Sequence, residues 1–253
     1  MKKTKTEWLY KIIKWFVKCF FPKMEVEGLE NLPEEPCLIV ANHSQMYGPV
    51  ACELYFPGNR YTWCAGQMMH RKDVPAYAYE DFWSAKPKWQ RPFWKLLSHL
   101  IAPVSVCVFN NANTIGVYRD SRIISTFKNT VKVLCEGASV VVFPECYEPY
   151  SNICHSFQKN FVDIAKLYYK RTGRSLKFVP MYIAPNLKKM FIEKSISYEY
   201  TNDAELERTR ICDYLMKTIT SKGRSLPKHR VVPYPNIPKE DYPCNISDEV
   251  NVP

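Results

Sequence analysis

The residue of this chain best placed for acid–base chemistry is His43. It follows Asn42 and the continuous apolar run 36–41, which is typical of a buried parallel strand. An imidazole takes up and releases protons near neutral pH. Reactive groups of α/β proteins lie at the carboxyl ends of parallel strands, so a histidine here is a candidate base. A lone histidine of this kind is more often structural, so the rest of the chain must decide its role.

The elements that would position His43 alternate between strands and helices. Strands are expected at residues 36–41, 61–65, 101–109, 139–143 and 177–183, with a loop or strand at 114–118. Helices are expected at residues 49–56, 121–136, 157–169 and 203–222, and helices around a loop over 75–100. Pro180 is expected at an edge or a bend of its strand. The alternation predicts an α/β fold with a largely parallel central sheet flanked by helices.

Composition and length set the organisation of the chain. Its 253 residues are 46% hydrophobic and 24% charged, which excludes intrinsic disorder, and no repeat is visible. We expect an amphipathic helix over residues 1–23, an α/β domain over 24–226 and an irregular tail over 227–253, where proline is frequent.

The ten cysteines form no pair with the spacing of a metal or redox motif. Most lie in apolar runs, which favours free thiols in a reducing compartment and predicts no metal site. Cys146 and His155 could imitate a nucleophile and its base after the strand 139–143. No orienting third group accompanies them, so a thiol hydrolase is disfavoured.

The amino-terminal segment carries most of the positive charge. The first 23 residues contain seven lysines and one glutamate, or +6 of the net +10. Trp8, Ile12, Trp15, Phe16 and Phe20 lie opposite the lysines at Lys11, Lys14 and Lys18. The helix is too short to span a bilayer and lacks a signal-peptide cleavage site.

This pattern predicts contact with an anionic membrane, and a peripheral location on its cytoplasmic face. The alternative is a helix docked on the protein's own core. Nucleic acid is a disfavoured partner, because the charge is concentrated in one segment.

Two further groups of residues leave alternatives open. The aromatic residues at 83, 89, 93 and 94 lie among the basic residues at 86, 88, 91 and 95. They could form a second interfacial surface or a packed helical hairpin. His70, His99 and His229 are interpreted as structural or surface residues.

Four blocks occur in a fixed order along the chain: Asn42–Gly48, Gly116–Arg119, Val142–Glu145 and Val179–Ile183. Over residues 25 to 220, this order and spacing resemble the PlsC-like glycerophosphate and lysophosphatidate O-acyltransferase family. The blocks also fall at or in expected strands.

The resemblance implies an activity and a set of roles. His43 would act as the general base that deprotonates a glycerolipid hydroxyl as it attacks an acyl thioester. Arg119 would bind the acceptor phosphate. The substrate-binding residues would also include Asn42, Ser44, Gly116, Pro144 and Glu145, the last accepting hydrogen bonds from hydroxyl or guanidinium groups. The donor would be acyl-CoA or acyl carrier protein, the acceptor a lysophospholipid, and no cofactor would be required.

The chain departs from the family pattern at position 48, where Gly48 replaces the aspartate that orients the histidine. Glu53 is the first candidate for a replacement carboxylate, with Asp73 and Glu80 behind it. Residues 146–149 also lack the family's glycine and second arginine. Two hypotheses therefore stay open: an active acyltransferase, and a weak or inactive relative that binds lysolipid. Arg119 could also belong to an ordinary exposed ion-pair turn with Asp120.

Overall fold

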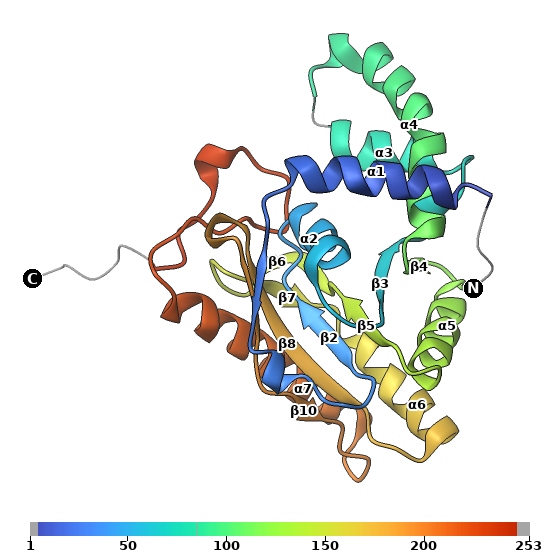
Figure 1. Cartoon of the computed structure of the whole chain (residues 1–253). Helices are drawn as coiled ribbons and strands as arrows, with labels where there is room; N and C mark the ends of the chain where they lie inside the picture. The colour runs from blue at the N-terminus through green and yellow to red at the C-terminus, as the bar shows by residue number, and fades with distance from the viewer. Residues whose placement is uncertain (1–4, 85, 247–253) are drawn as a thin grey trace, which may run out of the picture. The chain divides into compact units, whose positions relative to one another are not determined.

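The computed structural model describes residues 5–84 and 86–246, which form two compact units (Figure 1). Of the described residues, the helical unit comprises 5–21, 61–84 and 86–129, and the sheet unit comprises 22–60 and 130–246. These units follow different boundaries from the predicted ones. The ends of the predicted first and last segments, residues 1–4 and 247–253, lie outside the described residues.

The sheet unit is built on strands in the order β1-β9-β8-β2-β5, with β10 also paired to β8. Their bounds are β1 Glu25–Glu27, β2 Leu38–Ala41, β5 Ser139–Val142, β8 Lys177–Ala184, β9 Lys189–Ile192 and β10 Ile196–Ser197. The pairs β2–β5, β2–β8 and β1–β9 are parallel. All four residues of β2 are buried, as expected for a continuous apolar run between two neighbouring strands. The predicted α/β class with a largely parallel sheet is confirmed.

Helices of the sheet unit begin and end at recognisable residues. They are α2 Tyr47–Tyr55, α6 Ile164–Thr172 and α7 Ala204–Ser225; α5 Ile123–Cys135 crosses the boundary between the units. Single helical turns occur at Leu29–Asn31, Lys159–Asp163, Pro185–Leu187 and Lys239–Asp241. The Asp203 carboxylate accepts hydrogen bonds from two backbone amides at the start of α7, and Gly173 ends α6 in the left-handed conformation.

Pro180 was predicted at an edge or a bend of its strand, and the edge is ruled out because β8 lies inside the sheet between β2 and β9. On one side Pro180 pairs with Val40 of β2. On the other side the antiparallel partner changes, from β10 opposite residues 177–178 to β9 opposite residues 181–184. Proline is tolerated at this change of partner because a ladder hydrogen bond is interrupted there in any case.

Several short strands were not expected from the sequence. β9 and β10 follow β8, and a hairpin of β6 Glu145–Pro149 and β7 His155–Phe157 follows β5. The predicted helix over 157–169 begins later, with a helical turn at 159–163 before α6. The β6–β7 hairpin matters for function because it starts at Glu145.

The helical unit contains the paired parallel strands β3 Arg60–Ala65 and β4 Thr114–Val117. Its helices are α1 Glu7–Phe20, α3 Val74–Ala78 and α4 Arg91–Asn111, with single turns at Gly66–Met69, Tyr79–Trp83 and Lys88–Gln90. A small core of Met68, Val74, Ala78 and Ala102 joins α3 to α4.

The predicted strand at 101–109 is wrong, because these residues are the second half of α4. A short apolar run reads alike as a buried strand or as part of a helix. Here Ser105 donates to the carbonyl of Met68 (2.8 Å) and Asn110 to that of Met69 (2.9 Å), which fixes the run as a packed helix. By length and composition, Lys88–Asn111 could cross a membrane.

Candidate functional site

His43 lies at the carboxyl end of β2 and is held there by Asn42. The Asn42 side chain continues the ladder to β8: its Oδ1 accepts from the Ile183 amide (2.7 Å) and its Nδ2 donates to the Ile183 carbonyl (3.0 Å). Nδ2 also donates to Ser44 Oγ (2.8 Å). Asn42 and Ser44 are both buried. Both side chains therefore bond within the chain, and their role in substrate binding stays a prediction.

The loop after His43 turns sharply. Ser44 and Gln45 have φ values of 48° and 52°, a left-handed conformation that is costly for residues other than glycine. The chain then enters α2, and Gly48 packs against the His43 carbonyl. A Cβ at Gly48 would overlap that oxygen and lie 3.1 Å from Phe143 Cε1. The loop therefore has no space for a side chain at position 48, which agrees with the presence of glycine where the family has aspartate.

Glu145 ties the end of β5 to the His43 loop. Val40 and Val142 are paired in the parallel register, so His43 and Glu145 each lie three residues beyond a paired position. Glu145 Oε2 accepts from the His43 amide (2.5 Å), and Oε1 accepts from the His155 amide (2.8 Å). Glu145 is only 4% exposed. Its donors are backbone amides of this chain, in place of the predicted substrate hydroxyl or guanidinium groups.

Burial shifts the pKa of both groups. It raises the pKa of Glu145 to about 7, although hydrogen bonds from the His155 and His43 amides and from the Cys154 thiol act in the opposite direction. It lowers the pKa of His43 to about 4, while the backbone of Gln45 acts in the opposite direction. The imidazole is therefore neutral at pH 7, which is the form that a general base requires.

The orientation of the His43 ring does not come from a carboxylate. Its Nδ1 atom is buried and has no hydrogen-bond partner within residues 5–84 and 86–246. Glu53, on α2, therefore does not replace the missing aspartate at this atom. Asp73 and Glu80 belong to the helical unit, at the start of α3 and in the turn after it.

Aromatic rings enclose the imidazole instead. Phe143 lies with its centroid 5.1 Å from that of His43 at an interplanar angle of 64°, and Tyr234 lies at 5.6 Å and 81°. Tyr234 also contacts Tyr147 (5.4 Å) and His155 (5.9 Å) of the β6–β7 hairpin. Edge contacts of this kind fix ring orientation without hydrogen bonds.

Tyr234 belongs to the carboxyl-terminal strap, which we define as residues 227–246. Gln45 binds the strap twice: its Nε2 donates to the Pro235 carbonyl (2.9 Å), and its Oε1 accepts from the Tyr242 hydroxyl (3.0 Å). The tail was predicted to be extended and irregular, and its few regular residues agree with this. Its packing on the His43 loop was not predicted.

Both ends of the strap are anchored in the sheet unit. The His229 amide donates to Asn245 Oδ1 (2.8 Å), and Asn245 Nδ2 donates to the Gly223 carbonyl (2.8 Å). His229 Nε2 lies 2.8 Å from the Tyr182 hydroxyl, so His229 is structural, as expected. These bonds hold the strap in place at both sides of Tyr234.

Arg119 and Gly116 lie in the helical unit, at and just after β4. Arg119 is exposed; burial raises the pKa of Asp81, and the charge of Arg119 acts in the opposite direction. The ion pair in this turn joins Asp120 to Arg122 (2.7 Å) and does not include Arg119. A Cβ at Gly116 would lie 3.0 Å from Met69 Sδ, so close packing explains this glycine.

Other predicted candidates have structural roles. His155 Nδ1 lies 3.2 Å from the carbonyl oxygens of Cys146 and Tyr147, so its ring faces backbone oxygens. Pro144 is buried, and its carbonyl accepts from the Gln158 amide (2.8 Å). His70 is bonded to the Tyr118 hydroxyl (3.0 Å) within the helical unit.

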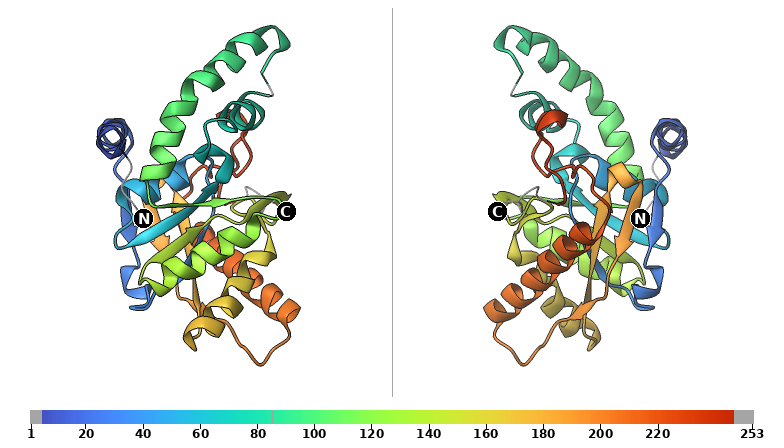
Figure 2. Two further views of the ribbon diagram at one scale, coloured as in Figure 1. Left: turned by 90° about the vertical axis from the view of Figure 1, so that its right-hand side faces the viewer. Right: turned by 90° about the vertical axis from the view of Figure 1, so that its left-hand side faces the viewer.

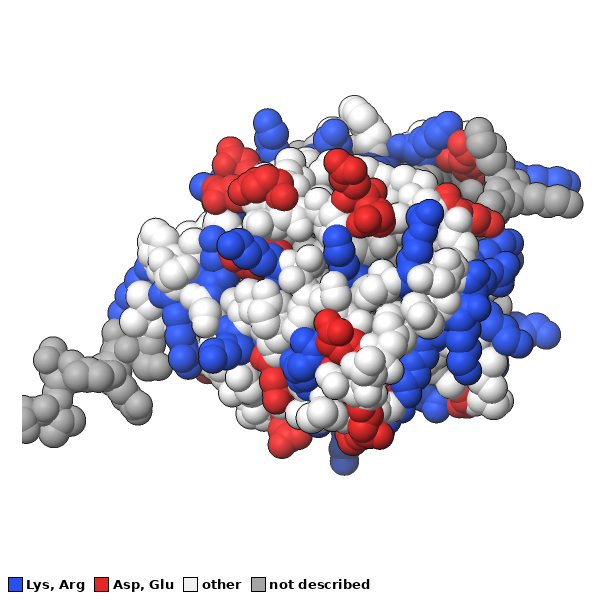
Figure 3. All heavy atoms as spheres, turned by 90° about the horizontal axis from the view of Figure 1, so that it is seen from below, with Lys and Arg blue, Asp and Glu red and all other residues white. Residues whose placement is uncertain are grey.

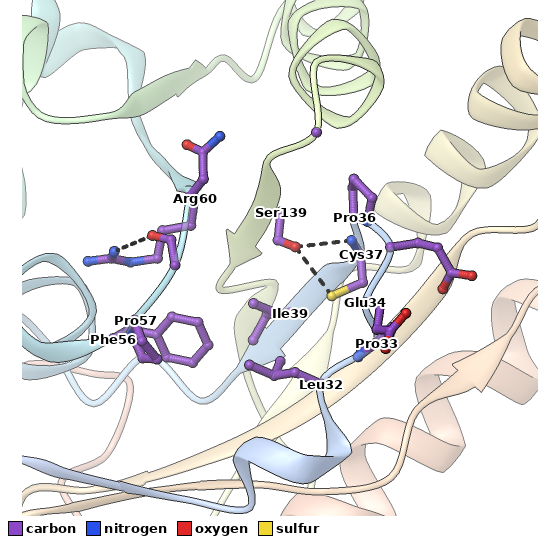
Figure 4. Close-up of a pocket in the computed structure, with 14 residues that line it drawn as sticks. Leu32, Pro33, Glu34, Pro36, Cys37, Ile39, Phe56, Pro57, Arg60 and Ser139 are labelled. Atoms are coloured by element: carbon purple, nitrogen blue, oxygen red, sulfur yellow. Dashed lines mark hydrogen bonds between the residues drawn. The ribbon is translucent and has the colours of Figure 1, made fainter.

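A cavity of about 200 Å³ lies at the opposite end of the strands from His43 (Figure 4). Ile39, Phe56 and Cys37 line it beside Ser139, the first residue of β5. Cys37 is bonded to Ser139, and burial raises the pKa of its thiol to about 11. Because it opens at the amino ends of β2 and β5, this cavity is separate from the candidate site.

The predicted membrane residues lie on α1, in the helical unit (Figure 2). None of the described residues of α1 is buried. The five predicted apolar residues are all exposed: Trp8, Ile12, Trp15, Phe16 and Phe20. Lys11 pairs with Glu7 (3.0 Å). These five side chains therefore do not form the contact of α1 with its own unit, while Leu9, Ile13 and Val17 on the same helix are half-buried.

Elsewhere, acidic and basic side chains are mixed. On the face shown in Figure 3, Asp and Glu side chains interrupt the Lys and Arg side chains. After the first 23 residues the chain carries only +4 of its net +10. Neither observation describes a continuous basic surface of the kind that binds nucleic acid.

Sequence reasoning missed Tyr234, Gln45 and the amide contacts of Glu145. Gln45 and Pro235 of the strap meet across 190 residues, and a proline-rich tail carries no periodicity that would reveal its packing. The common offset of His43 and Glu145 from the ends of their strands was the one available signal, because equal offsets on parallel neighbours place residues side by side.

Comparisons with known proteins give a structural likeness and no likeness by sequence. No protein-family model matches the chain, and no curated protein matches it by sequence. Among solved structures, the chain is similar to the 1-acyl-sn-glycerophosphate (LPA) acyltransferase PlsC from Thermotoga maritima, at 17% identity and a TM-score of 0.45. The match covers 85% of this chain and 81% of that one. Similarity this distant does not assign an activity.

Proposed function

We propose that the chain is a peripheral membrane O-acyltransferase that moves a fatty acyl group from a thioester to the hydroxyl of a glycerolipid. The observation that carries the proposal is the meeting of two of the four sequence blocks, where the Glu145 carboxylate binds the His43 amide. A neutral histidine is thereby fixed at the carboxyl edge of a parallel sheet, where chemistry is expected.

In the proposed reaction, His43 takes the proton of the acceptor hydroxyl as its oxygen attacks the thioester carbonyl. The C–S bond then breaks, and the thiolate leaves with a proton. The donor is acyl-CoA or acyl carrier protein, and the acceptor is a lysophosphatidate-like lipid. Arg119 is the proposed ligand of the acceptor phosphate. No prosthetic group takes part.

Glu145 is a positioning residue in this scheme. It fixes the backbone of His43 through the amide, while Phe143 and Tyr234 fix the ring. An imidazole with a pKa near 4 is a weak base, so we expect slower proton transfer than at a site tuned close to pH 7.

The test measures thiol release from acyl-CoA and from acyl carrier protein, with and without lysophosphatidate. Wild type, His43→Ala and the exposed control His70→Ala are compared. Release that requires the acceptor, and that falls by about 10²–10⁴ in His43→Ala alone, supports the proposal. Equal release by wild type and His43→Ala contradicts it.

A second test addresses Arg119. Arg119→Ala is expected to raise the acceptor KM for lysophosphatidate, with a much smaller effect on a monoacylglycerol. Equal effects on both acceptors would remove Arg119 from the phosphate site.

A second candidate function is lysolipid binding without acyl transfer. It is favoured by the unpartnered Nδ1 of His43 and by the loop that leaves no space for a side chain at Gly48. Lysophosphatidate binding by wild type, with no thiol release from either donor, would select this function.

A further inference from the structure

The helix α4 carries two opposite faces. Ser98, Ala102 and Ser105 are buried and lie on one side of the helix. Ala102 belongs to the core shared with α3, and Ser105 donates to the Met68 carbonyl (2.8 Å). This side attaches α4 to its own unit.

The other side of α4, together with the turn just before it, is an exposed apolar stripe, which we define as Trp89, Phe93, Leu96, Leu100 and Val104. At about 100° per residue, the four positions on α4 lie within about 80° of one another and opposite the side of Ser98, Ala102 and Ser105, and Trp89 lies in the turn just before the helix. Trp89 is 80% exposed and Leu100 63% exposed. Contiguous apolar residues on a surface mark a contact with a partner or a membrane.

The stripe leads to α1. The next positions on the same side of α4 are Cys107 and Asn111, and both contact Thr6, just before α1. Cys107 Sγ donates to the Thr6 carbonyl (3.6 Å), and Asn111 Nδ2 donates to Thr6 Oγ1 (3.0 Å). The first half of α4 extends past α1 (Figures 1 and 2). The exposed stripe of α4 therefore ends where α1 begins, on one side of the helical unit.

The positive charge on α1 and α4 indicates which kind of partner binds the exposed stripe. The stretch Lys88–Asn111 contains Lys88, Arg91 and Lys95 and no acidic residue. α1 adds three lysines and one glutamate. Aromatic and aliphatic residues bordered by cations fit the interface of an anionic bilayer.

We propose that the α4 stripe is a second membrane-docking element, which lies with α1 in the interfacial layer of an anionic phospholipid bilayer. α4 does not span the bilayer, because its buried side stays packed on α3. The inference rests on the membrane association in the proposed function and is independent of acyl transfer.

The experiment is cosedimentation of the full chain with vesicles of phosphatidylcholine and phosphatidylglycerol. The double variant Leu96→Gln/Leu100→Gln is compared with Leu206→Gln, which alters an exposed leucine on α7 of the sheet unit. We expect the α4 variant to lower the partition coefficient at least about tenfold, and the control to bind as wild type. Binding of the α4 variant equal to the control overturns the proposal.

Three controls separate the outcomes. Unchanged thermal unfolding shows that the α4 variant is folded. Release of wild type from the vesicles by alkaline carbonate supports interfacial docking, whereas retention overturns it in favour of a spanning helix. Self-association of wild type that Leu96→Gln/Leu100→Gln abolishes would assign the stripe to a second copy of the chain. Thiol release is measured separately, so a failed acyl-transfer assay leaves this test intact.

Discussion

Aromatic residues pack around a polar side chain in the sheet unit, whereas in the helical unit they are exposed. In the sheet unit, Phe143 and Tyr234 pack against a half-buried imidazole, and the polar groups around it are bonded within the chain. In the helical unit, Trp15 and Trp89 point into solvent from helices that carry lysines. The comparison teaches that changes in the first region should act on folding and chemistry, while changes in the second should act on association.

The largest effect is expected from Glu145→Ala. It leaves the amides of His43 and His155 buried without an acceptor, so we expect the free energy of unfolding to fall by about 2–5 kcal/mol. Urea unfolding monitored by circular dichroism measures the change. A loss below about 1 kcal/mol would mean that Glu145 does not hold the loop.

The pH dependence of stability should separate the two buried groups. Glu145 has a pKa of about 7 when folded and one near 4.5 when unfolded, so its contribution falls as the pH rises between these values. His43 has a pKa of about 4 when folded and one near 6.5 when unfolded, so its contribution rises with pH in that interval.

Each slope amounts to about 1.4 kcal/mol per pH unit, and the two oppose each other in wild type between pH 4.5 and 6.5. We expect Glu145→Gln to gain stability with rising pH in this window, and His43→Asn to lose it. Parallel curves for wild type and both variants would disprove the shifts.

A smaller loss is expected for Gly48→Ala. Alanine in a helix is ordinarily more stable than glycine by about 1 kcal/mol. Here the new Cβ overlaps the His43 carbonyl, so we expect destabilisation of about 1–3 kcal/mol. The control is Gly58→Ala, where the new Cβ meets no atom and the only cost in stability comes from the positive φ of 83°. Stabilisation by Gly48→Ala would contradict the described loop. Gly48→Asp is expected to destabilise the protein as well, because its Cβ meets the same His43 carbonyl.

In the helical unit, Trp15→Ala/Phe16→Ala should weaken vesicle binding by about tenfold or more, because two exposed apolar side chains are lost. The free energy of unfolding should change by less than about 0.5 kcal/mol, as for surface positions generally. A large loss of stability with intact vesicle binding would mean that these α1 side chains pack within the protein and do not contact the membrane.

The smallest effect is expected for Tyr234→Leu. It removes an edge contact with His43 but keeps an apolar side chain on the strap, so we expect kcat to fall severalfold at unchanged KM. Tyr234→Phe keeps the ring and should retain the wild-type kcat. A rise in KM alone would make Tyr234 a substrate contact.

Sequence reasoning succeeded where one local pattern determines the structure. The buried runs of β2, β5 and β8 and the amphipathic pattern of α1 were recognised at nearly their observed bounds. It failed for residues 101–109, where apolar content alone does not separate a strand from a helix. It also missed the β6–β7 hairpin and the role of the strap, because both depend on contacts between residues far apart in the chain.

For the site, residue types could be predicted but their partners could not. His43 and Glu145 were both identified, and Glu145 was expected to face substrate. Its actual partners are backbone amides, which no sequence pattern encodes. The clash that Gly48 avoids depends on the conformation of the preceding loop, which is set by two residues with positive φ.

The bonds of Gln45 to Pro235 and Tyr242 have a consequence for the order of events during synthesis. The His43 loop is made early, yet its enclosure needs residues about 190 positions later in the chain. A growing polypeptide on the ribosome therefore has an open, unfinished histidine site until about residue 242 has emerged. Chains released too early would keep most of the sheet and lack an ordered site.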